Sequence, residues 1–251
     1  MAVFPVQQVP LILLETKMWL NASYVLNAVT ANPADATPIS SWANLDGNIM
    51  TCGQASATNQ PLFKTNIAAG KPALLFDGSN DGMALTGTGP LTAAQRFAST
   101  SVFTMAFVFR ALVTTGNAQC LEAMRGAVAT DKTTLGIDAT GNLYWEVNNA
   151  GVITTIATAF SDTTNPHIVL VTNDGASGLT MYLDGVQITG GAATSGTSGT
   201  ANTVEIGNIP VAFTRAFNGY IFDFFHSGKI LTTDERNQLT TFFSNFYGVS
   251  I

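Results

Sequence analysis

Most enzymes that cleave glycosidic bonds need two carboxylates at a fixed separation, one acting as acid and the other as base or nucleophile. On a β-strand, residues two apart project from the same face, so an acidic pair with one residue between them would be the signature. None of the sixteen Asp and Glu residues forms such a pair. The closest approaches are Asp234-Glu235, which suits the first turn of a helix, and Asp77 with Asp81, which flank a turn. The sequence therefore predicts no glycosidase active site.

Nucleophilic catalysis has no better support in the sequence. The chain has two histidines, His167 directly after Pro166 and His226 at the end of an apolar run. We interpret both as structural residues at strand ends. No Gly-x-Ser-x-Gly elbow, phosphate-binding loop or cluster with metal-ligand spacing occurs. We predict that the protein is not an enzyme.

Two loops are rich in side-chain oxygens, which are the ligands that Ca²⁺ prefers. They are Asp77-Gly-Ser-Asn-Asp81 and Asn173-Asp-Gly-Ala-Ser177. The same residue types also form tight turns in which the side chains hydrogen-bond to their own backbone. The low charge of the chain favours the turn interpretation. We therefore expect no cofactor and no metal, with Ca²⁺ as the alternative.

A glycan site would combine an exposed aromatic ring, on which a sugar face stacks, with amide and carboxylate groups. Trp145 lies in the sequence Tyr-Trp-Glu-Val-Asn-Asn, which includes Asn148 and offers the best such cluster. Together with Asn80 and Asp81 of the first oxygen-rich loop, Trp145 and Asn148 are the predicted glycan-binding residues. The alternative is that Trp145 belongs to the core, which is common for a tryptophan on a strand.

The charge balance excludes two classes of partner. Charged residues are only 10% of the 251, with ten Lys and Arg against sixteen Asp and Glu, for a net charge of −6. The ten basic residues are scattered singly, so no basic face can neutralise phosphates, and we expect no nucleic-acid partner. The same scatter excludes polybasic attachment to a membrane, and no apolar run approaches the roughly 20 residues that span a bilayer.

The periodic signals are short and typical of β-strands. Residues 101–110 alternate with apolar side chains on both faces, which favours a central strand covered on both sides. Residues 134–147 indicate a hairpin that turns at 138–142, and residues 167–188 continue as a meander. Turns recur every eight to twelve residues or so, as in a sandwich or barrel.

The C-terminal segment changes to helical spacing. Thr232 or Thr233 can cap a helix near 233–246, and Gly248 stands where a helix stops. We expect this helix to cover one edge or end of the sheets. Residues 190–202 are small and polar, and we expect them to form a flexible exposed loop within the domain.

Several phrases of the chain occur in an order that is typical of one family. They are Met18-Trp-Leu-Asn-Ala22, Gly70-Lys-Pro-Ala-Leu-Leu-Phe-Asp-Gly-Ser79, Met181-Tyr-Leu-Asp-Gly185, Glu205-Ile-Gly207, Phe217-Asn-Gly-Tyr-Ile221 and Leu231-Thr-Thr-Asp-Glu-Arg236. Over residues 18 to 248 the chain resembles the laminin-G-like, concanavalin A-like jelly-roll domain of bacterial surface proteins and tailed-phage virion proteins. The resemblance implies an all-β fold, a two-sheet antiparallel jelly-roll sandwich over residues 18–251 with one C-terminal α-helix.

The resemblance also implies a function. We expect a non-enzymatic structural protein of a bacteriophage virion, either a capsid decoration, a head fibre or a tail-associated subunit, made in the host cytoplasm. Adhesion to cell-surface glycans is part of this expectation. The alternative is a carbohydrate-binding module of a bacterial surface protein.

The first 17 residues are expected to form an arm. Pro5 and Pro10 interrupt its apolar stretch, and it lacks the basic start of a signal peptide. An isolated tail cannot bury Phe4, Val9 and Leu11, so we predict that the arm contacts other virion proteins or another copy in a homo-oligomer. Packing of residues 11–14 on the chain's own domain stays open. Cys52 and Cys120 are expected to be unpaired thiols.

Overall fold

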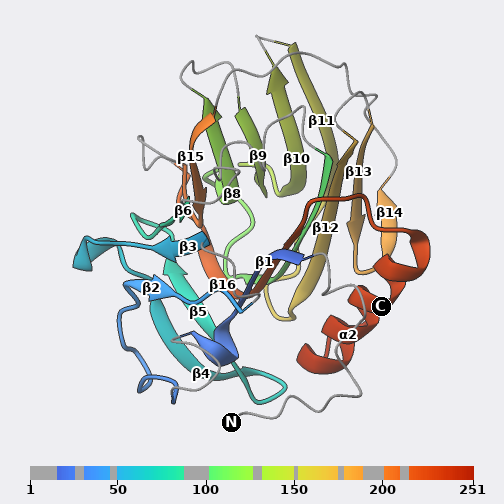
Figure 1. Cartoon of the computed structure of the whole chain (residues 1–251). Coiled ribbons are helices and arrows are strands. Elements are labelled where there is room, and N and C mark those ends of the chain that lie inside the picture. The colour runs from blue at the N-terminus through green and yellow to red at the C-terminus, as the bar shows by residue number, and fades with distance from the viewer. Residues whose placement is uncertain are drawn as a thin grey trace.

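The computed structural model in Figure 1 shows two antiparallel β-sheets packed face to face, with one long helix against the outside of one of them. It describes residues 16–25, 31–45, 50–87, 102–126, 132–149, 152–174, 178–188, 201–209 and 215–251. The predicted two-sheet antiparallel sandwich with one C-terminal helix is confirmed. Within those ranges, no helix is long and apolar enough to cross a membrane.

Sheet A contains eight strands in the order β14-β13-β12-β7-β16-β5-β4, and β1 pairs with β16 as well. Its strands are β1 (Thr16–Asn21), β4 (Leu62–Ala68), β5 (Lys71–Asp77), β7 (Val102–Ala111), β12 (His167–Asp174), β13 (Leu179–Leu183), β14 (Val186–Ile188) and β16 (Asn218–Ser227). Strands that are neighbours in the sheet are often far apart in sequence. The sheet therefore forms only when the two halves of the chain come together.

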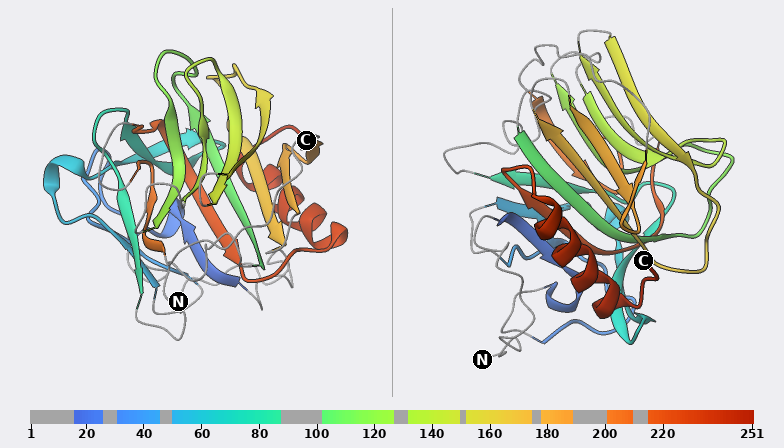
Figure 2. Two further views of the ribbon diagram at one scale, coloured as in Figure 1. Left: turned by 90° about the horizontal axis from the view of Figure 1, so that it is seen from above. Right: turned by 90° about the vertical axis from the view of Figure 1, so that its right-hand side faces the viewer.

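Sheet B also has eight strands, in the order β11-β10-β9-β8-β15-β6-β3-β2. They are β2 (Ser41–Trp42), β3 (Met50–Gly53), β6 (Met83–Gly87), β8 (Gln119–Gly126), β9 (Lys132–Ile137), β10 (Asn142–Asn149), β11 (Val152–Ala159) and β15 (Ala201–Ile206). Short 3₁₀ turns, η2 (Ala22–Tyr24) and η3 (Ala57–Asn59), follow β1 and precede β4. The two sheets and the helix outside them are visible from two further directions in Figure 2.

Strand β7 shows why both faces of sheet A are apolar. Phe103, Met105, Phe107 and Phe109 point into the core between the sheets, whereas Ala106 and Val108 point to the other side and belong to a second apolar cluster. All six side chains are fully buried. The period of two residues thus places large rings in the core and small residues where a helix must approach closely. The predicted central strand is confirmed.

Helix α2 (Thr233–Tyr247) covers that second face of sheet A. Thr232 is its N-cap, and a reciprocal pair of hydrogen bonds with Glu235 completes a capping box. Gly248 ends the helix with a left-handed φ of 71°. Leu239 and Phe243 pack with residues of the central strands of sheet A in the second cluster. The helix therefore covers a sheet face, and the expectation that it covers an edge or end is wrong, because the small residues of the central strands admit it there.

A buried carboxylate joins β1, β16 and α2. The Cα partners of β16 on β7 skip a residue between Ile221 and Asp223, which is the mark of a β-bulge. Asp223, fully buried, accepts hydrogen bonds from Trp19 Nε1 at 2.7 Å, Asn21 Nδ2 at 2.8 Å and the Tyr247 hydroxyl at 2.8 Å. Burial raises the pKa of Asp223 to about 8, although these hydrogen bonds oppose the rise. We refer to Trp19, Asn21, Asp223 and Tyr247 as the Asp223 cluster.

Four aspartates close turns of the sandwich through their own backbone. Asp77, Asp138, Asp162 and Asp174 each accept a hydrogen bond from a backbone N–H two to four residues further along. At Asp138, burial raises the pKa, but hydrogen bonds from Asn142 and Thr140 outweigh it and hold the pKa at about 2. Side chains that fix a turn in this way are committed to the local fold. These carboxylates are therefore poor candidates for catalysis.

Three of the predictions concern the arm, the small-residue loop and the cysteines. Residues 1–15 and 189–200 lie outside the described residues, so the arm with Phe4, Val9 and Leu11 and most of the predicted exposed loop stay predictions. Cys52 and Cys120 are both buried, and neither forms a disulfide within the part of the chain that the structure describes. Burial raises the pKa of the Cys52 thiol, which keeps it in the less reactive protonated form.

Candidate functional site

Trp145 lies in the core and is not a platform for a sugar. Its side chain is fully buried on the inner face of β10, and its ring meets that of Phe103 of the opposite sheet edge to face, with centroids 6.2 Å apart. A sugar cannot stack on a ring that has no exposed face. The structure contradicts Trp145 as a glycan-binding residue and supports the alternative that it packs in the core.

The other predicted glycan residues do not form one site. Asn148 is on β10 and is buried, whereas Asn80 and Asp81 are in the turn between β5 and β6. Three strands of sheet B separate β10 from β6. At about 4.8 Å per strand, this separation is larger than one sugar unit can bridge. Asn148 and the turn must therefore be considered separately.

The outward side of β10 carries an aromatic residue that the sequence analysis passed over. Tyr144 is next to Trp145 and points the other way, and its hydroxyl accepts a hydrogen bond from Arg215 Nη1 at 3.1 Å. Burial is the main cause that raises the pKa of Tyr144. Only 5% of the Tyr144 side chain is exposed, so this ring too is unavailable for stacking. Successive side chains of a strand point to opposite faces, and this alternation could have identified Tyr144 as the aromatic residue on the face opposite to Trp145.

The oxygen-rich turn 77–81 uses its carboxylates internally. Asp77 Oδ1 accepts from the backbone N–H of Ser79 at 2.8 Å and of Asn80 at 3.2 Å, and Asp81 Oδ2 accepts from the Asp77 N–H at 3.0 Å. Burial, together with the nearby Asp77 charge, raises the pKa of Asp81 to about 6. Among the residues that the structure describes, no three His, Cys, Asp or Glu side chains gather as metal ligands. These contacts are the ones expected of a tight turn whose side chains hydrogen-bond to their own backbone.

Beside that turn, polar side chains from two loops form a connected surface. The Ser56 and Thr58 hydroxyls are 3.1 Å apart, Thr58 donates to Asn59 Oδ1 at 3.0 Å, and Asn80 Nδ2 donates to the same oxygen at 3.1 Å. The first three residues belong to the β3–β4 connection and the fourth to the β5–β6 turn. We name these four residues the amide rim. Ser56 and Thr58 are exposed and the two amides are half-buried, so the rim is open to solvent.

The amide rim has unused hydrogen-bonding capacity. Asn59 Nδ2 and Asn80 Oδ1 make no hydrogen bond to other described residues, whereas Asn59 Oδ1 accepts two. An amide donor and an amide acceptor therefore lie side by side, 21 positions apart in the sequence. A sugar hydroxyl both donates and accepts a hydrogen bond, so this pair matches it chemically.

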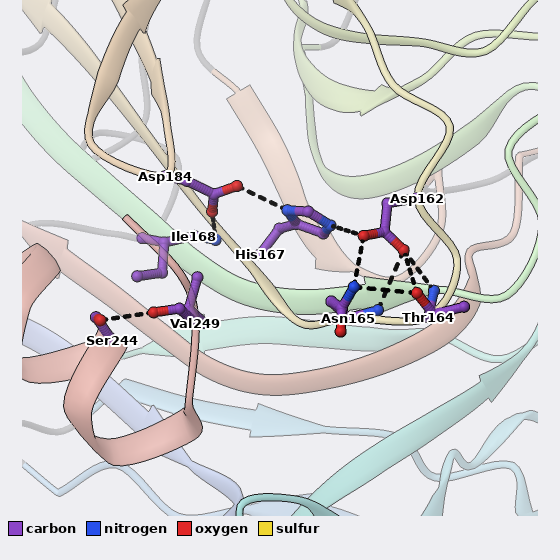
Figure 3. A network of polar contacts seen from close by, with 8 residues as sticks. All are labelled: Asp162, Thr164, Asn165, His167, Ile168, Asp184, Ser244 and Val249. Carbon is purple, nitrogen blue, oxygen red and sulfur yellow. Dashed lines mark hydrogen bonds and ion pairs between the residues drawn. The ribbon is translucent and has the colours of Figure 1, made fainter.

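His167 lies between two carboxylates, as a catalytic histidine can, at a different loop of the sandwich (Figure 3). His167 Nδ1 is 2.7 Å from Asp184 Oδ2, and His167 Nε2 is 3.5 Å from Asp162 Oδ2. Asp184 also accepts from the Ile168 N–H at 2.8 Å, and Asp162 accepts from Thr164 and Asn165 of its own loop. The imidazole thus joins the loop before β12 to the β13–β14 turn.

This arrangement fixes the loops and does not suit acid–base catalysis. Burial lowers the pKa of His167, but Asp184 and Asp162 outweigh burial and raise it. Both ring nitrogens face a carboxylate, so neither points to solvent as a free base. The imidazole also stands between Asp162 and Asp184, where a glycosidase would need room for substrate. His167 is therefore the structural strand-end residue that the sequence analysis expected.

Comparison with known proteins now places the fold. Residues 77–235 match the family described as the Concanavalin A-like lectin/glucanases superfamily. The chain belongs to this superfamily. The match runs from the turn beside the amide rim to the start of α2, and it therefore covers most of both sheets. A search of curated proteins gave no match.

Solved structures with the same fold include the binding domains of botulinum neurotoxins. The serotype D binding domain has a TM-score of 0.62 at 12% identity, over 90% of this chain and 51% of that one. The serotype D domain in complex with N-acetylneuraminic acid gives 0.63 at 13%, over 90% and 50%. The DC domain in complex with rat synaptotagmin II gives 0.62 at 14%, over 92% and 52%.

The chain spans about half the length of each of these binding domains. At 12 to 14% identity the similarity shows the fold alone. The fold is thus a lectin-like binding fold, and the ligands named for those proteins belong to those proteins.

Proposed function

We propose that the protein is a non-catalytic glycan-binding domain and that the amide rim contacts the sugar. The open Asn59–Asn80 pair carries this proposal, because it offers a donor and an acceptor side by side on an exposed loop surface. The lectin-like fold adds support. The carboxylates of the described turns are committed to their own backbone, which favours binding over hydrolysis.

The rim suits a neutral sugar better than a charged ligand. Its four side chains are uncharged, and the chain as a whole is poor in charge. The Ser56, Thr58 and Asn59 side chains already orient one another, so little rotamer freedom remains to be lost when a ligand binds. A hydroxyl placed between Asn59 Nδ2 and Asn80 Oδ1 would extend this network.

Alanine at Asn80 tests the site. With a sugar identified on a glycan array, Asn80→Ala is expected to weaken binding about 10-fold, since one hydrogen bond contributes about 1 kcal/mol or somewhat more. Asn165→Ala on the His167 loop is the matched control and should bind as the wild type does. Titration calorimetry measures both. Loss of binding by the control alone would place the sugar elsewhere, and a glycan array without any bound sugar would reject the function.

We further propose that the domain is carried on a phage virion, with its N-terminal arm as the attachment. The proposal is supported by the resemblance to virion proteins and by a composition in which only 10% of the residues are charged. Many copies on one particle would give useful avidity even when each sugar contact is weak. A carbohydrate-binding module of a bacterial surface protein is the alternative.

Deletion of residues 2–9 tests the attachment. The truncated protein should keep its thermal midpoint, because residues 2–9 are expected to contact other chains and not the sandwich. Its occupancy in particles of the phage that encodes it should fall strongly, since the apolar side chains Phe4 and Val9 are lost. Quantitative mass spectrometry against the major capsid protein measures occupancy. Normal incorporation of the truncated protein would reject the arm as an anchor.

A further inference from the structure

We propose that Gln54 is a positioning residue for sugar binding, because it joins the two loops that carry the amide rim. This role rests on the proposed glycan site. Gln54 is not itself a rim residue, and it acts through Gly82 and Ser56, to which the two ends of its side-chain amide are bonded.

The strands alone do not fix the amide rim. β3 pairs with β6 in sheet B, where the last pair before the rim is Gly53 opposite Ala84. β4 pairs with β5 in sheet A, where the first pair after the rim is Leu62 opposite Leu75. The β3–β4 connection and the β5–β6 turn run between these two ladders, so their separation depends on contacts between the loops.

All four polar groups of Gln54 are used. Its Nε2 donates to the Gly82 carbonyl in the turn at 2.7 Å, and its Oε1 accepts from the Ser56 N–H in the connection at 3.0 Å. Its backbone N–H donates to the Ser40 carbonyl at 2.9 Å, and its carbonyl accepts from Gln60 Nε2 at 2.9 Å. The side-chain amide is therefore an anchored bridge between the two loops.

Gly82 is held on both sides by the β3–β4 connection. Its N–H donates to the Asn59 carbonyl at 3.2 Å, and its carbonyl accepts from Gln54. A Cβ at Gly82 would lie 2.9 Å from the Cβ of the fully buried Asn208, so the turn is also tightly packed at this point. Because Gly82 lies two residues after Asn80 and bonds to Asn59 itself, its position sets the separation of the two rim amides.

The bond between the two rim amides cannot set this separation alone. Asn80 Nδ2 donates to Asn59 Oδ1 at 3.1 Å at a half-buried position, where water competes for both groups. Gln54 supplies the further links that keep Asn59 Nδ2 and Asn80 Oδ1 side by side before a sugar arrives. Without Gln54, both side chains must be ordered on binding, which we expect to raise the dissociation constant about 5–30-fold.

The first experiment needs no sugar. The side-chain amide signal of Asn80 in an NMR spectrum reports its hydrogen bond, and Asn59→Ala, which removes the acceptor, gives the position of the unpaired signal. In Gln54→Ala the Asn80 signal should move most of the way to that position. Gln60→Ala also loses a hydrogen bond to Gln54, but within the β3–β4 connection, and should leave the signal in place. An Asn80 signal unchanged by Gln54→Ala rejects the proposal.

The second experiment measures binding of neutral probes, the methyl glycosides of galactose, glucose and mannose. In the wild type, at least one probe should shift the Asn59 and Asn80 amide signals. Gln54→Ala should raise the dissociation constant of that probe about 5–30-fold, whereas Gln60→Ala should bind as the wild type does. Both residues are half-buried, so thermal unfolding should show small losses for both variants. Binding of the probe by Gln54→Ala at the wild-type level rejects the proposal.

Gln54→Glu separates the two halves of the bridge. A glutamate keeps an oxygen for the Ser56 N–H but has no N–H to donate to the Gly82 carbonyl, so this variant should bind the probe as weakly as Gln54→Ala does. Wild-type binding by Gln54→Glu would reject the link to Gly82 as the cause. If no probe shifts the rim signals of the wild type, the glycan site fails, and the sugar-binding role of Gln54 fails with it. A displaced Asn80 signal in Gln54→Ala would then show that the failure lies in the glycan site and not in the positioning of the rim.

Discussion

Asp223→Ala lowers the free energy of unfolding by about 3–9 kcal/mol, because it removes the acceptor of three buried hydrogen bonds at about 1–3 kcal/mol each. The donors are the Trp19 indole, the Asn21 amide and the Tyr247 hydroxyl. All three side chains are at most 7% exposed, so water cannot easily replace the carboxylate. Urea unfolding, followed by tryptophan fluorescence, measures the loss.

Asp35→Ala is the matched control for that substitution. Asp35 also accepts three hydrogen bonds, from Lys64 Nζ, the Thr65 N–H and the Thr65 hydroxyl, but it lies at the surface. Water can take over its role, so stability should change little. Equal losses for the two variants would contradict the importance assigned to burial of the Asp223 cluster.

The Asp223 cluster also predicts a direction for the pH dependence. The pKa of Asp223 is raised from 3.8 to about 8 by folding, so between these values the folded state holds a proton that the unfolded state has released. The stabilisation from this proton is complete below pH 3.8 and is lost as the pH rises through 8. The advantage of the wild type over Asp223→Asn should therefore shrink between these pH values, by up to about 1.4 kcal/mol per pH unit. If the stability advantage of the wild type over Asp223→Asn grew with pH, the raised pKa of Asp223 would be contradicted.

Gly207→Ala is expected to cost about 2–5 kcal/mol, the sum of a left-handed backbone at about 1–2 and overpacking at about 1–3. Gly207 has a φ of 82°, and a Cβ there would lie 2.2 Å from the ring of Phe76. Phe76 is fully buried and packs against Phe217, so it has nowhere to move. Thermal and urea unfolding measure the cost.

Gly185→Ala separates the backbone contribution to this loss of stability from the packing contribution. Gly185 has the same φ of 82°, but its added Cβ meets only the Thr240 methyl group at 3.6 Å. This variant should lose only the backbone contribution of about 1–2 kcal/mol. The difference between the two variants is then the cost of packing against Phe76. If both variants lose the same amount, the ring moves aside, contrary to the expectation.

The parts of the fold that the sequence predicted are those determined by nearby residues. The α2 capping box lies within four residues, Thr232 to Glu235, and the stop at Gly248 follows from one left-handed position. The two apolar faces of β7 follow from its period of two residues. Such features depend only on local geometry, which the local sequence determines.

Features that depend on distant residues could not be predicted. Asp223 finds Trp19 and Asn21 more than 200 positions away, and the bulge beside Phe222 that permits this contact has no sequence signal of its own. The same applies to the glycan residues. Alternation shows that Trp145 and Tyr144 point to opposite sides, but not which side is the core. The amide rim exists only because the fold brings Asn59 to Asn80.

The Asp223 cluster has a mechanical consequence. It ties β1, at the start of the described chain, and α2, near its end, to the same strand β16. Because Thr16 lies opposite Ser227 in this antiparallel ladder, a force that pulls the two ends of the chain apart would open the ladder from that end, one hydrogen bond after another, and would reach the cluster at Asn21 and Asp223 last. A domain that holds a particle to a cell under flow would meet such forces. We therefore expect this seam to decide how the domain yields under tension.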